Sequence, residues 1–402
     1  MEARAWLFGA LLAIAPANAR AQDRQTPLTE TPGQGKLAIE TDSFSLRLRG
    51  YLQTDWRHVF GDGPWSDAFL IRRARAVFEG SAFHRVEVKI MADFAASPML
   101  YDAYVDAKIT GGLRLRFGKD KLPISIERLR SARNLLFVER AQPGTFTPVR
   151  EMGVQIIAEP FDGRLSASAG VMQGAADGVN PDIFSADAGG DDKDVVGRVF
   201  VRPFTRGIFS GLGFGVSASI GSATGSSTSP RLPAYKTTAQ VTYFSFRSGA
   251  VAYDSRAHLG AQLHWTAGPA EVMAEAIESV QGVKLDAATA RLENGAYAVQ
   301  LALVATGERA AWEGIVPKHE WGAFVIAART QGSRFDGRAF PVFADPAVAA
   351  RSSLAFGGSL TWIWNAVFEL QSTWESTMFS GGAKIGDRAT EHALSMRAQA
   401  AF

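Results

Sequence analysis

The chain has 402 residues, no cysteine and a formal net charge of +2, with 40 glycines, 26 phenylalanines and 9 tryptophans. The absence of cysteine excludes a disulfide scaffold, a thiolate nucleophile and a cysteine-ligated metal. A net charge near zero gives no electrostatic reason to expect nucleic acid as a partner, so any charge selectivity must depend on where the charges lie.

Residues 1–21 predict a secretory signal peptide. Arg4 precedes an apolar stretch, residues 6–15, that is too short to span a bilayer as a helix. Pro16 and a small-x-small cleavage site at residues 19–21 follow it. A short N-terminal membrane anchor is the alternative.

The export signal is followed by a polar segment, residues 22–43, which is rich in Pro and Gly and predicts a flexible lead-in. The remaining residues, 44–402, are expected to form one folded domain. No run of about 18 apolar residues occurs after the signal, so no transmembrane helix is predicted.

Strand-like alternation opens and closes this domain. In residues 44–60, apolar side chains alternate with polar and charged ones, and residues 391–402 alternate in the same way and stop on Phe402. Successive side chains of a strand point to opposite faces, so each segment has one apolar and one polar face. A last strand that ends on an aromatic residue is typical of an outer-membrane barrel, whose apolar face contacts lipid and whose polar face lines the lumen. We expect Phe402 to face lipid, Arg397 to face the lumen, and this strand to close the barrel against residues 44–60.

About 17 alternating segments can be marked, residues 235–246 among them, whereas a closed single-chain bacterial barrel takes an even number. We therefore predict an all-β fold, a transmembrane antiparallel β-barrel of about 16 strands, with about 18 as the alternative. The weak stretch at residues 101–117 is the expected place of the overcount. Both termini are expected on the periplasmic side.

The links between segments differ in length and composition. Short links predict periplasmic turns at residues 79–81, 161–163, 267–269 and 364–366. Long links rich in Gly, Asp and Ser predict extracellular loops at residues 174–193, 221–234, 282–293, 331–351 and 379–390. Tryptophans near strand ends or on the outward face indicate interfacial aromatic girdles, with a soluble aromatic core as the alternative; they are Trp56, Trp265, Trp321, Trp362, Trp364 and Trp374.

Residues 119–150 form a link unlike the others, long and rich in Arg, Pro and aromatic residues. A loop of this length is usually functional or disordered. Its apolar residues, including Leu135, Phe137 and Phe146, need a surface to pack on. We interpret this link as a constriction loop folded into the lumen, with an external flap as the alternative.

Several fragments, in this order and spacing, resemble the phosphate-selective porin O and P family. They are residues 48–53 (LRGYLQ), 69–75 (FLIRRAR), 78–80 (FEG), 93–94 (DF), 102–105 (DAYV), 117–119 (FGK), 121–127 (KLPISIE), 139–140 (ER), 150–154 (REMGV), 360–362 (LTW) and 397–402 (RAQAAF). Residues 200–350 match only in their strand pattern. The resemblance implies a 16-stranded barrel, a homotrimer, a third loop folded into the lumen, and a ladder of Arg and Lys leading to an anion-binding constriction.

This resemblance also implies which residues form the anion pathway. Arg72, Arg73 and Arg75 match the family's RRAR segment, and Lys119, Lys121, Arg140 and Arg150 match the edges of the inward loop; Arg128, Arg130 and Arg133 lie within that loop. The lysine-rich extracellular loops of the family are not evident, because residues 174–193 are acidic. That departure leaves phosphate specificity open.

Arginine suits anion passage because its planar, permanently charged guanidinium offers five donors to phosphate or carboxylate. A ring of such side chains in a narrow throat selects anions. Binding must remain weak enough for release, so a nearby counter-carboxylate is expected, with Asp93, Glu79 and Glu87 as candidates. The alternative is that these charges only pair across strands and stiffen the barrel wall.

No enzyme motif is evident: GxSxG, HExxH and P-loop patterns are absent, and no Ser/His pair on one face is identified. His258 and His264 share a face but lie too far apart for one compact metal site, so no metal or cofactor is expected.

The predicted function is a passive outer-membrane channel of a Gram-negative-type bacterium, mildly anion-selective, for small solutes such as phosphate or polyphosphate. A porin without a phosphate site, a plugged structural or adhesive barrel, and a soluble β-sandwich are the alternatives. The expected partners are a small anionic solute, membrane lipid and two further copies of the chain, with no nucleic acid.

Overall fold

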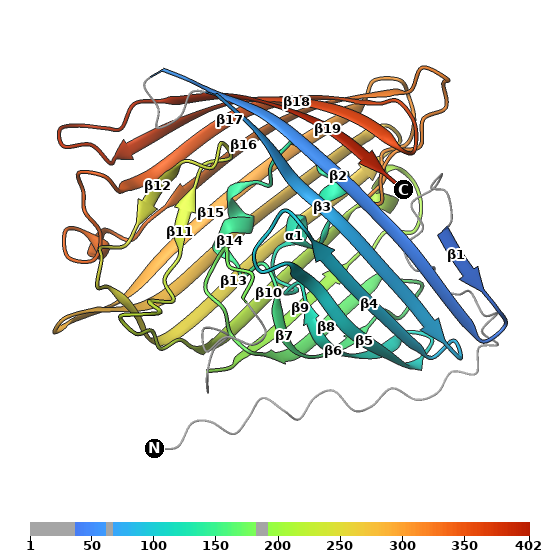
Figure 1. The fold of residues 1–402 in the computed structure, drawn as a ribbon, viewed down its shortest axis with the longest axis horizontal. Coiled ribbons are helices and arrows are strands. Elements are labelled where there is room, and N and C mark those ends of the chain that lie inside the picture. Colours follow the sequence, from blue (N-terminus) through green and yellow to red (C-terminus); the bar gives the residue numbers. More distant parts are fainter. Residues whose placement is uncertain (1–36, 62–66, 182–191) are drawn as a thin grey trace.

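The computed structural model describes residues 37–61, 67–181 and 192–402, and its main sheet closes into a 16-stranded antiparallel β-barrel (Figure 1). The barrel strands are β2 (Phe44–Phe60), β3 (Asp67–Ala82), β4 (Val86–Asp93), β5 (Leu100–Thr110), β6 (Leu113–Asp120), β7 (Glu151–Ala158), β8 (Leu165–Met172), β9 (Asp194–Val201), β10 (Gly213–Ser222), β13 (Val251–Ala267), β14 (Ala270–Leu285), β15 (Ala288–Val304), β16 (Ala323–Arg334), β17 (Ala350–Ile363), β18 (Phe368–Gly381) and β19 (Glu391–Ala401). The predicted fold class and the preferred strand number are confirmed.

Few other elements accompany the barrel. The short strand β1 (Leu37–Glu40), inside the predicted lead-in, pairs with β2. Strands β11 (Ala234–Lys236) and β12 (Thr242–Ser245) form a separate hairpin. The helical turns are α1 (Ile126–Leu129) and 3-10 turns at Ala132–Asn134, Gln142–Phe146, Ile208–Gly211 and Gly337–Ala339. In the described part of the chain, none of the helices could span a bilayer.

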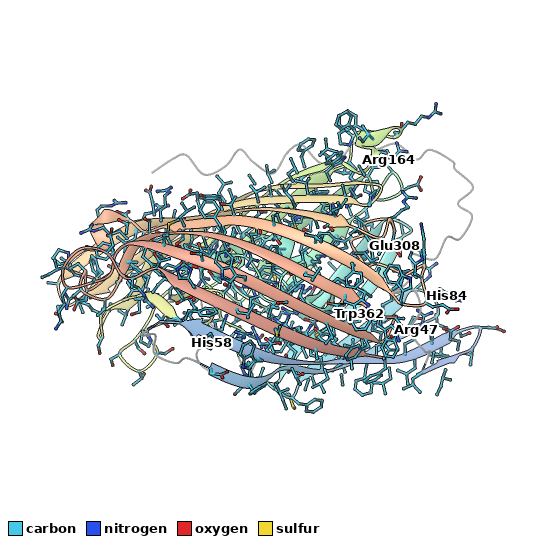
Figure 2. The ribbon with its side chains drawn as sticks, turned by 90° about the horizontal axis from the view of Figure 1, so that it is seen from above. Arg47, His58, His84, Arg164, Glu308 and Trp362 are labelled. Carbon is cyan, nitrogen blue, oxygen red and sulfur yellow. The ribbon has the colours of Figure 1, made fainter. Side chains whose placement is uncertain are left out.

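The last strand closes the barrel against the first barrel strand. Strand β19 pairs antiparallel with β2, from His392 opposite Phe60 to Ala401 opposite Tyr51. The backbones of Gly50 and Phe402 exchange two hydrogen bonds of 3.0 Å. We call the end where β2 begins and β19 ends the proximal end, and the opposite end the distal end. Figure 2 shows Arg47, His84, Arg164, Glu308 and Trp362 toward the proximal end, with His58 lying toward the distal end.

The two faces of the wall have the reverse of a soluble protein's polarity. Large apolar side chains point outward, such as Ile71 at 60% exposure and Phe402 at 48%, whereas Arg57 and Arg397 point inward and are almost fully buried. Such a surface requires an apolar solvent around the barrel. Trp265, Trp321, Trp362 and Trp364 lie at or next to the proximal ends of barrel strands, whereas Trp56 and Trp374 lie at similar levels further toward the distal end. The predicted faces are therefore confirmed, and the girdle interpretation is supported.

The overcount lies elsewhere than predicted. Residues 101–117 belong to two genuine barrel strands, β5 and β6, so placing the overcount there was wrong. The extra segment is 235–246, whose two halves pair with each other as β11 and β12 rather than with the barrel. Its aromatic side chains are buried in a cluster at the distal end, which includes Tyr235, Phe244 and Phe335. Alternation of apolar and polar residues indicates that one face of a segment is covered, but it does not show what covers that face. A loop hairpin and a barrel strand can therefore have the same pattern.

Three links also differ from expectation. Residues 282–293 were predicted as a long loop, but β14 and β15 run through them and leave a two-residue turn, 286–287, where Asp286 has a φ of 53°. The turn predicted at 79–81 lies at 83–85 because β3 continues to Ala82. The proximal link 305–322 is long, against the expectation that proximal links are short. The signal peptide and most of the lead-in lie outside the described residues, so these boundaries remain predictions.

Candidate functional site

Residues 121–150, which we call the long loop, begin with a short capped helical turn. The Ser125 side chain accepts a hydrogen bond of 3.1 Å from the backbone N–H of Arg128, as an N-cap serine does. Glu275 of β14 accepts from the Ser125 hydroxyl at 3.0 Å and from the Ile126 backbone N–H at 2.6 Å. One inward carboxylate of the barrel wall therefore holds the first turn of this loop.

Further anchors connect the long loop to inward-facing side chains on opposite parts of the wall. Ser217 of β10 donates to Ile124 O at 2.7 Å, Gln371 of β18 to Leu135 O at 3.1 Å, and Arg397 of β19 to Val138 O at 2.6 Å; Gln142 N donates to Gln331 of β16 at 2.7 Å. Buried backbone groups need partners, and here the wall side chains supply them. These bonds fix the path of the loop relative to the barrel.

Glu139 of the long loop lies among arginines of the barrel wall. It accepts from Arg57 at 2.6 Å, forms a bidentate contact with Arg72, and lies 3.5 Å from the Arg73 Nη2 atom. Arg397 is 3.8 Å away. Burial alone would raise the pKa of the Glu139 carboxyl, but the charges of Arg72, Arg57 and Arg73 hold it well below its usual range.

A β-bulge explains why two consecutive arginines reach the same acid. Gln53 pairs with Arg73 and Thr54 pairs with Ile71, which leaves Arg72 as an extra residue in β3. A bulge shifts the alternation by one, so Arg72 and Arg73 both point inward. Arg73 also donates to Gln53 at 2.7 Å and is 2% exposed. These two predicted pathway residues thus bind the loop, a position that parity alone did not show.

A cavity of about 190 Å³ lies beside the long loop on its proximal side. Its charged lining comprises seven cations (Arg49, Arg75, Lys89, Lys121, Arg133, Arg140 and Arg150) and three carboxylates (Glu79, Asp102 and Glu313). We call it the basic cavity. Of the ten predicted cationic site residues, it brings together Arg75, Lys121, Arg133, Arg140 and Arg150.

Several of these cations are neutralised by wall carboxylates. Arg75 donates to Asp93 at 2.8 Å and to the Tyr51 hydroxyl at 2.7 Å. Arg150 donates to Asp102 at 2.7 Å, and Lys89 lies 3.4 Å from the same carboxylate. The paired cations stiffen the wall, as the alternative interpretation of the charge pattern expected.

Three cations of the basic cavity, which we call the carbonyl-held cations, are bound differently. Lys121 donates to Leu129 O at 2.8 Å, Arg140 to Arg130 O at 2.9 Å, and Arg133 to Ala366 O at 2.6 Å. Among the described residues, none of these three cations forms a salt bridge with a carboxylate. Carbonyl oxygens orient them without cancelling their charge, so the cavity keeps a positive potential.

The pKa directions in the long loop agree with this potential. Burial lowers the pKa of the Lys121 amine well below its usual range, and the charges of Arg150 and Arg140 lower it further. Burial also lowers the pKa of Arg140 to about 10, with Arg150 acting in the same direction. An anion that entered the cavity would relieve this repulsion between like charges.

The other predicted cations lie outside the basic cavity. Lys119 donates to the carbonyls of Leu100 and Pro181, Arg128 to that of Gly144, and Arg130 to the Glu271 carboxylate. Of the three predicted counter-carboxylates, only Glu79 lines the cavity, where it pairs with Arg49; Asp93 binds Arg75 and Glu87 binds Lys108.

The proximal link 305–322 completes the site and was not recognised from sequence. The Trp312 ring, which lines the basic cavity, lies 5.1 Å from the His264 ring, and the Arg130 guanidinium lies 5.3 Å from its centroid. Arg130 also donates to Ala311 O at 3.3 Å. A long link with a central tryptophan, between two barrel strands, was the available signal.

A buried serine–histidine pair was also not recognised from the sequence. Ser219 and His258 are register partners on β10 and β13, with Oγ and Nδ1 2.7 Å apart, and His258 Nε2 is 2.7 Å from Asp177. Tyr235 and Ser279 donate to the same aspartate. Ser219, His258 and Asp177 are all buried, and none of them lines the basic cavity. These hydrogen bonds therefore attach Asp177 to the barrel wall, and the Ser219 hydroxyl is not exposed to the basic cavity as a nucleophile there would need to be.

A closed 16-stranded barrel with an apolar exterior and a charged interior cavity defines an outer-membrane channel of the porin class. Residues 47–402 match the sequence profile of the phosphate-selective porin O and P family, and the chain belongs to that family. The resemblance seen in the sequence fragments is thereby confirmed. Among curated proteins, none matches the chain significantly.

Solved porin structures share the fold at low sequence identity. The outer-membrane channel DcaP of Acinetobacter baumannii superposes with a TM-score of 0.58 at 12% identity, covering 90% of this chain and 99% of that one. The anion-selective porin of Comamonas acidovorans gives 0.54 at 10% identity, over 90% of this chain and 100% of that one. OmpT of Vibrio cholerae gives 0.55 at 10% identity, over 91% and 100% of the two chains.

Proposed function

We propose that this outer-membrane channel passes small anions by passive diffusion, and that the long loop lies within the lumen and narrows it. The main support for this proposal is the basic cavity, in which seven cations outnumber three carboxylates. A narrow passage with excess fixed positive charge and a low-dielectric wall favours anions over cations. The anchors between the long loop and strands β10, β14, β16, β18 and β19 support its inward position.

Selectivity in this proposal depends on the carbonyl-held cations. Since no carboxylate in the described part of the chain pairs with Lys121, Arg133 or Arg140, they are the side chains that an anion would meet. Arg75 and Arg150 also line the cavity, but each of them forms an ion pair with a carboxylate. The expected anion preference is mild, because Glu79 and Asp102 line the same cavity and weaken binding enough for release.

The test is the reversal potential of the reconstituted channel in a potassium chloride gradient. The double variant Lys121→Gln with Arg140→Gln should lose most of the anion preference. The double control Arg334→Gln with Arg338→Gln removes the same number of positive charges from exposed pairs with Glu278 and Asp336 outside the cavity and should leave the preference intact. Equal effects of the double variant and the control would contradict the assignment.

Phosphate is one solute that the proposed channel would pass, but anion passage does not depend on a phosphate site. A guanidinium cluster suits the phosphate oxyanion, and the family's description supports that choice. The acidic residues 174–193 argue against a phosphate-concentrating mouth, and part of that segment lies outside the described residues. Block of chloride current by added phosphate would identify a phosphate site, whereas unblocked current would indicate general anion passage.

A plugged barrel is the second candidate, and one observation favours it. At the distal end, Phe146 of the long loop packs with Tyr235, Phe244 and Phe335 in one buried cluster, and the rings of Phe244 and Phe335 lie 3.9 Å apart. This cluster ties three distal loops together. Negligible conductance from a correctly folded, heat-modifiable barrel would support the plug and contradict the channel proposal.

Two further proposals concern the mature protein. The signal peptide predicts that the exported chain begins at Gln22, which N-terminal sequencing of the outer-membrane protein would check. The family resemblance supports a homotrimer, and mass measurement of the detergent-solubilised protein would distinguish three copies from one.

A further inference from the structure

A second cavity, of about 280 Å³, lies between the long loop and the proximal link 305–322. Arg133 and Asn134 line both this cavity and the basic cavity. Residues 133–134 therefore form a shared wall, and a molecule on one side of it can contact the same guanidinium as a molecule on the other. We call the second space the apolar cavity.

The chemistry of the two cavities differs. The apolar cavity is lined mainly by aliphatic and aromatic side chains, such as those of Leu135, Leu136, Ile315, Val316, Ile363 and Phe368. Its charged lining is balanced, with Arg130 and Arg133 against Glu320 and Glu369. An inorganic anion gains nothing from such walls, whereas an apolar group gains free energy by leaving water.

Arg133 supplies the charge at the boundary. Its Nη2 atom donates to Ala366 O at 2.6 Å, and this is its one side-chain hydrogen bond within the described part of the chain. A guanidinium carries five N–H donors in a planar fork. Burial lowers the pKa of Arg133, and the nearby charge of Glu369 raises it. Donors therefore remain for a carboxylate that enters either cavity.

We propose that the apolar cavity is a binding site for organic anions, which place a carboxylate on Arg133 and an apolar body against Leu136, Ile315 and Val316. This proposal rests on the proposed function and names its solute class. The volume suits a body of about one ring, since an apolar cavity of roughly 150 Å³ is enough to bind benzene. Glu369, which accepts from Gln399 at 3.3 Å, repels the carboxylate and keeps the affinity low enough for passage.

The test compares benzoate, acetate and inorganic phosphate as blockers of chloride current through the reconstituted full-length protein. Benzoate should block at a concentration about tenfold lower than acetate, because only benzoate has an apolar body to bury. Equal block by benzoate and acetate, in a channel that still prefers anions, would overturn this inference and leave the proposed function standing. A preference for cations would overturn both.

A matched pair of variants locates the block. Val316→Asp places a carboxylate in the apolar cavity, and Val342→Asp makes the same change at a similarly exposed valine in the distal link between β16 and β17. Val316→Asp should remove the advantage of benzoate over acetate, and Val342→Asp should retain it. Heat modifiability on gels verifies that both variants are folded. An undiminished benzoate advantage in folded Val316→Asp would place the block elsewhere and overturn the inference.

Discussion

Glu139 and Arg57 lie 82 residues apart in the sequence and are joined by a hydrogen bond of 2.6 Å that the Arg57 guanidinium donates. Arg57 also donates to Asp55, which in turn accepts from Arg397 of the closing strand at 2.7 Å. The long loop is thus attached to the seam where β2 and β19 meet. Closing the barrel and positioning the loop are parts of one buried ionic network.

Replacing Glu139 with Gln should loosen the long loop. Removing one member of a buried ion pair typically costs about 3–5 kcal/mol, because the partner charges remain buried. Arg57, Arg72 and Arg73 would lose their common acid. We expect larger current fluctuations in single-channel recordings and faster hydrogen exchange across the loop. Glu293→Gln at the exposed rim is the control, and matching traces from the two variants would contradict the prediction.

The attachment of the loop should survive mild acid. A carboxyl whose pKa is depressed on folding contributes stability above its unfolded pKa and loses it only as the pH falls through the folded value. The arginines hold the pKa of Glu139 well below its ordinary value, so current fluctuations at about pH 4 should match those at about pH 7. A rise in fluctuation across that interval in the wild type, but not in Glu139→Gln, would show that Glu139 is protonated too easily for this account.

Anion preference should fall as the pH is raised. Burial lowers the pKa of Lys121 well below its usual range, so its amine loses its proton, and the cavity one positive charge, before an exposed lysine would. Arg140, with a pKa of about 10, keeps most of its charge up to about pH 9.5. Reversal potentials between about pH 6 and about pH 9.5 should therefore shift toward non-selectivity in the wild type. The shift should be much smaller in Lys121→Gln, and its persistence there at full size would assign it to another group.

The proximal link should restrict the channel through Trp312. This ring packs beside His264 and under Arg130, so Trp312→Ala opens space next to the basic cavity without changing its charge. We expect higher conductance with a similar anion preference. Trp374→Ala, at an exposed tryptophan that lines neither cavity, should leave conductance unchanged. An unaltered conductance in Trp312→Ala would remove the link from the conduction path.

Barrel closure should depend on Gly50. A Cβ atom at this position would lie 2.5 Å from the Phe402 ring and 2.7 Å from Arg75 O. Relieving the second contact requires the backbone of β3 to move, which costs free energy. Gly80→Ala is the matched control, because its nearest neighbour would be 3.6 Å away. Gly50→Ala should slow the appearance of the heat-modifiable form during refolding relative to Gly80→Ala. Equal folding rates would show that the Phe402 ring moves aside freely.

The wall of the barrel was predictable because alternation is a local property. Arg397 and Phe402 lie on opposite faces of the closing strand, and their parity alone assigns lumen and lipid. The fragment match added the family and the strand number. Residues 235–246 show the limit, since their alternating pattern did not reveal that the cover was a cluster of loops rather than lipid.

The candidate site was predictable only in composition. The sequence showed that arginines gather near residue 73 and in the long loop, but not which of them meet an acid. Arg73 is bound by Glu139, far away in the chain, and Arg72 joins it through a bulge that shifts the alternation. Lys121 and Arg140, in contrast, face the cavity because backbone carbonyls hold them. Such choices depend on loop conformation, which side-chain periodicity does not encode.

The most direct test of the channel account is the reversal potential of the wild-type protein in a potassium chloride gradient. The seven cations and three carboxylates of the basic cavity predict a measurable conductance whose reversal potential has the sign of chloride preference. A reversal potential with the sign of potassium preference would contradict the account, as would a folded barrel that does not conduct.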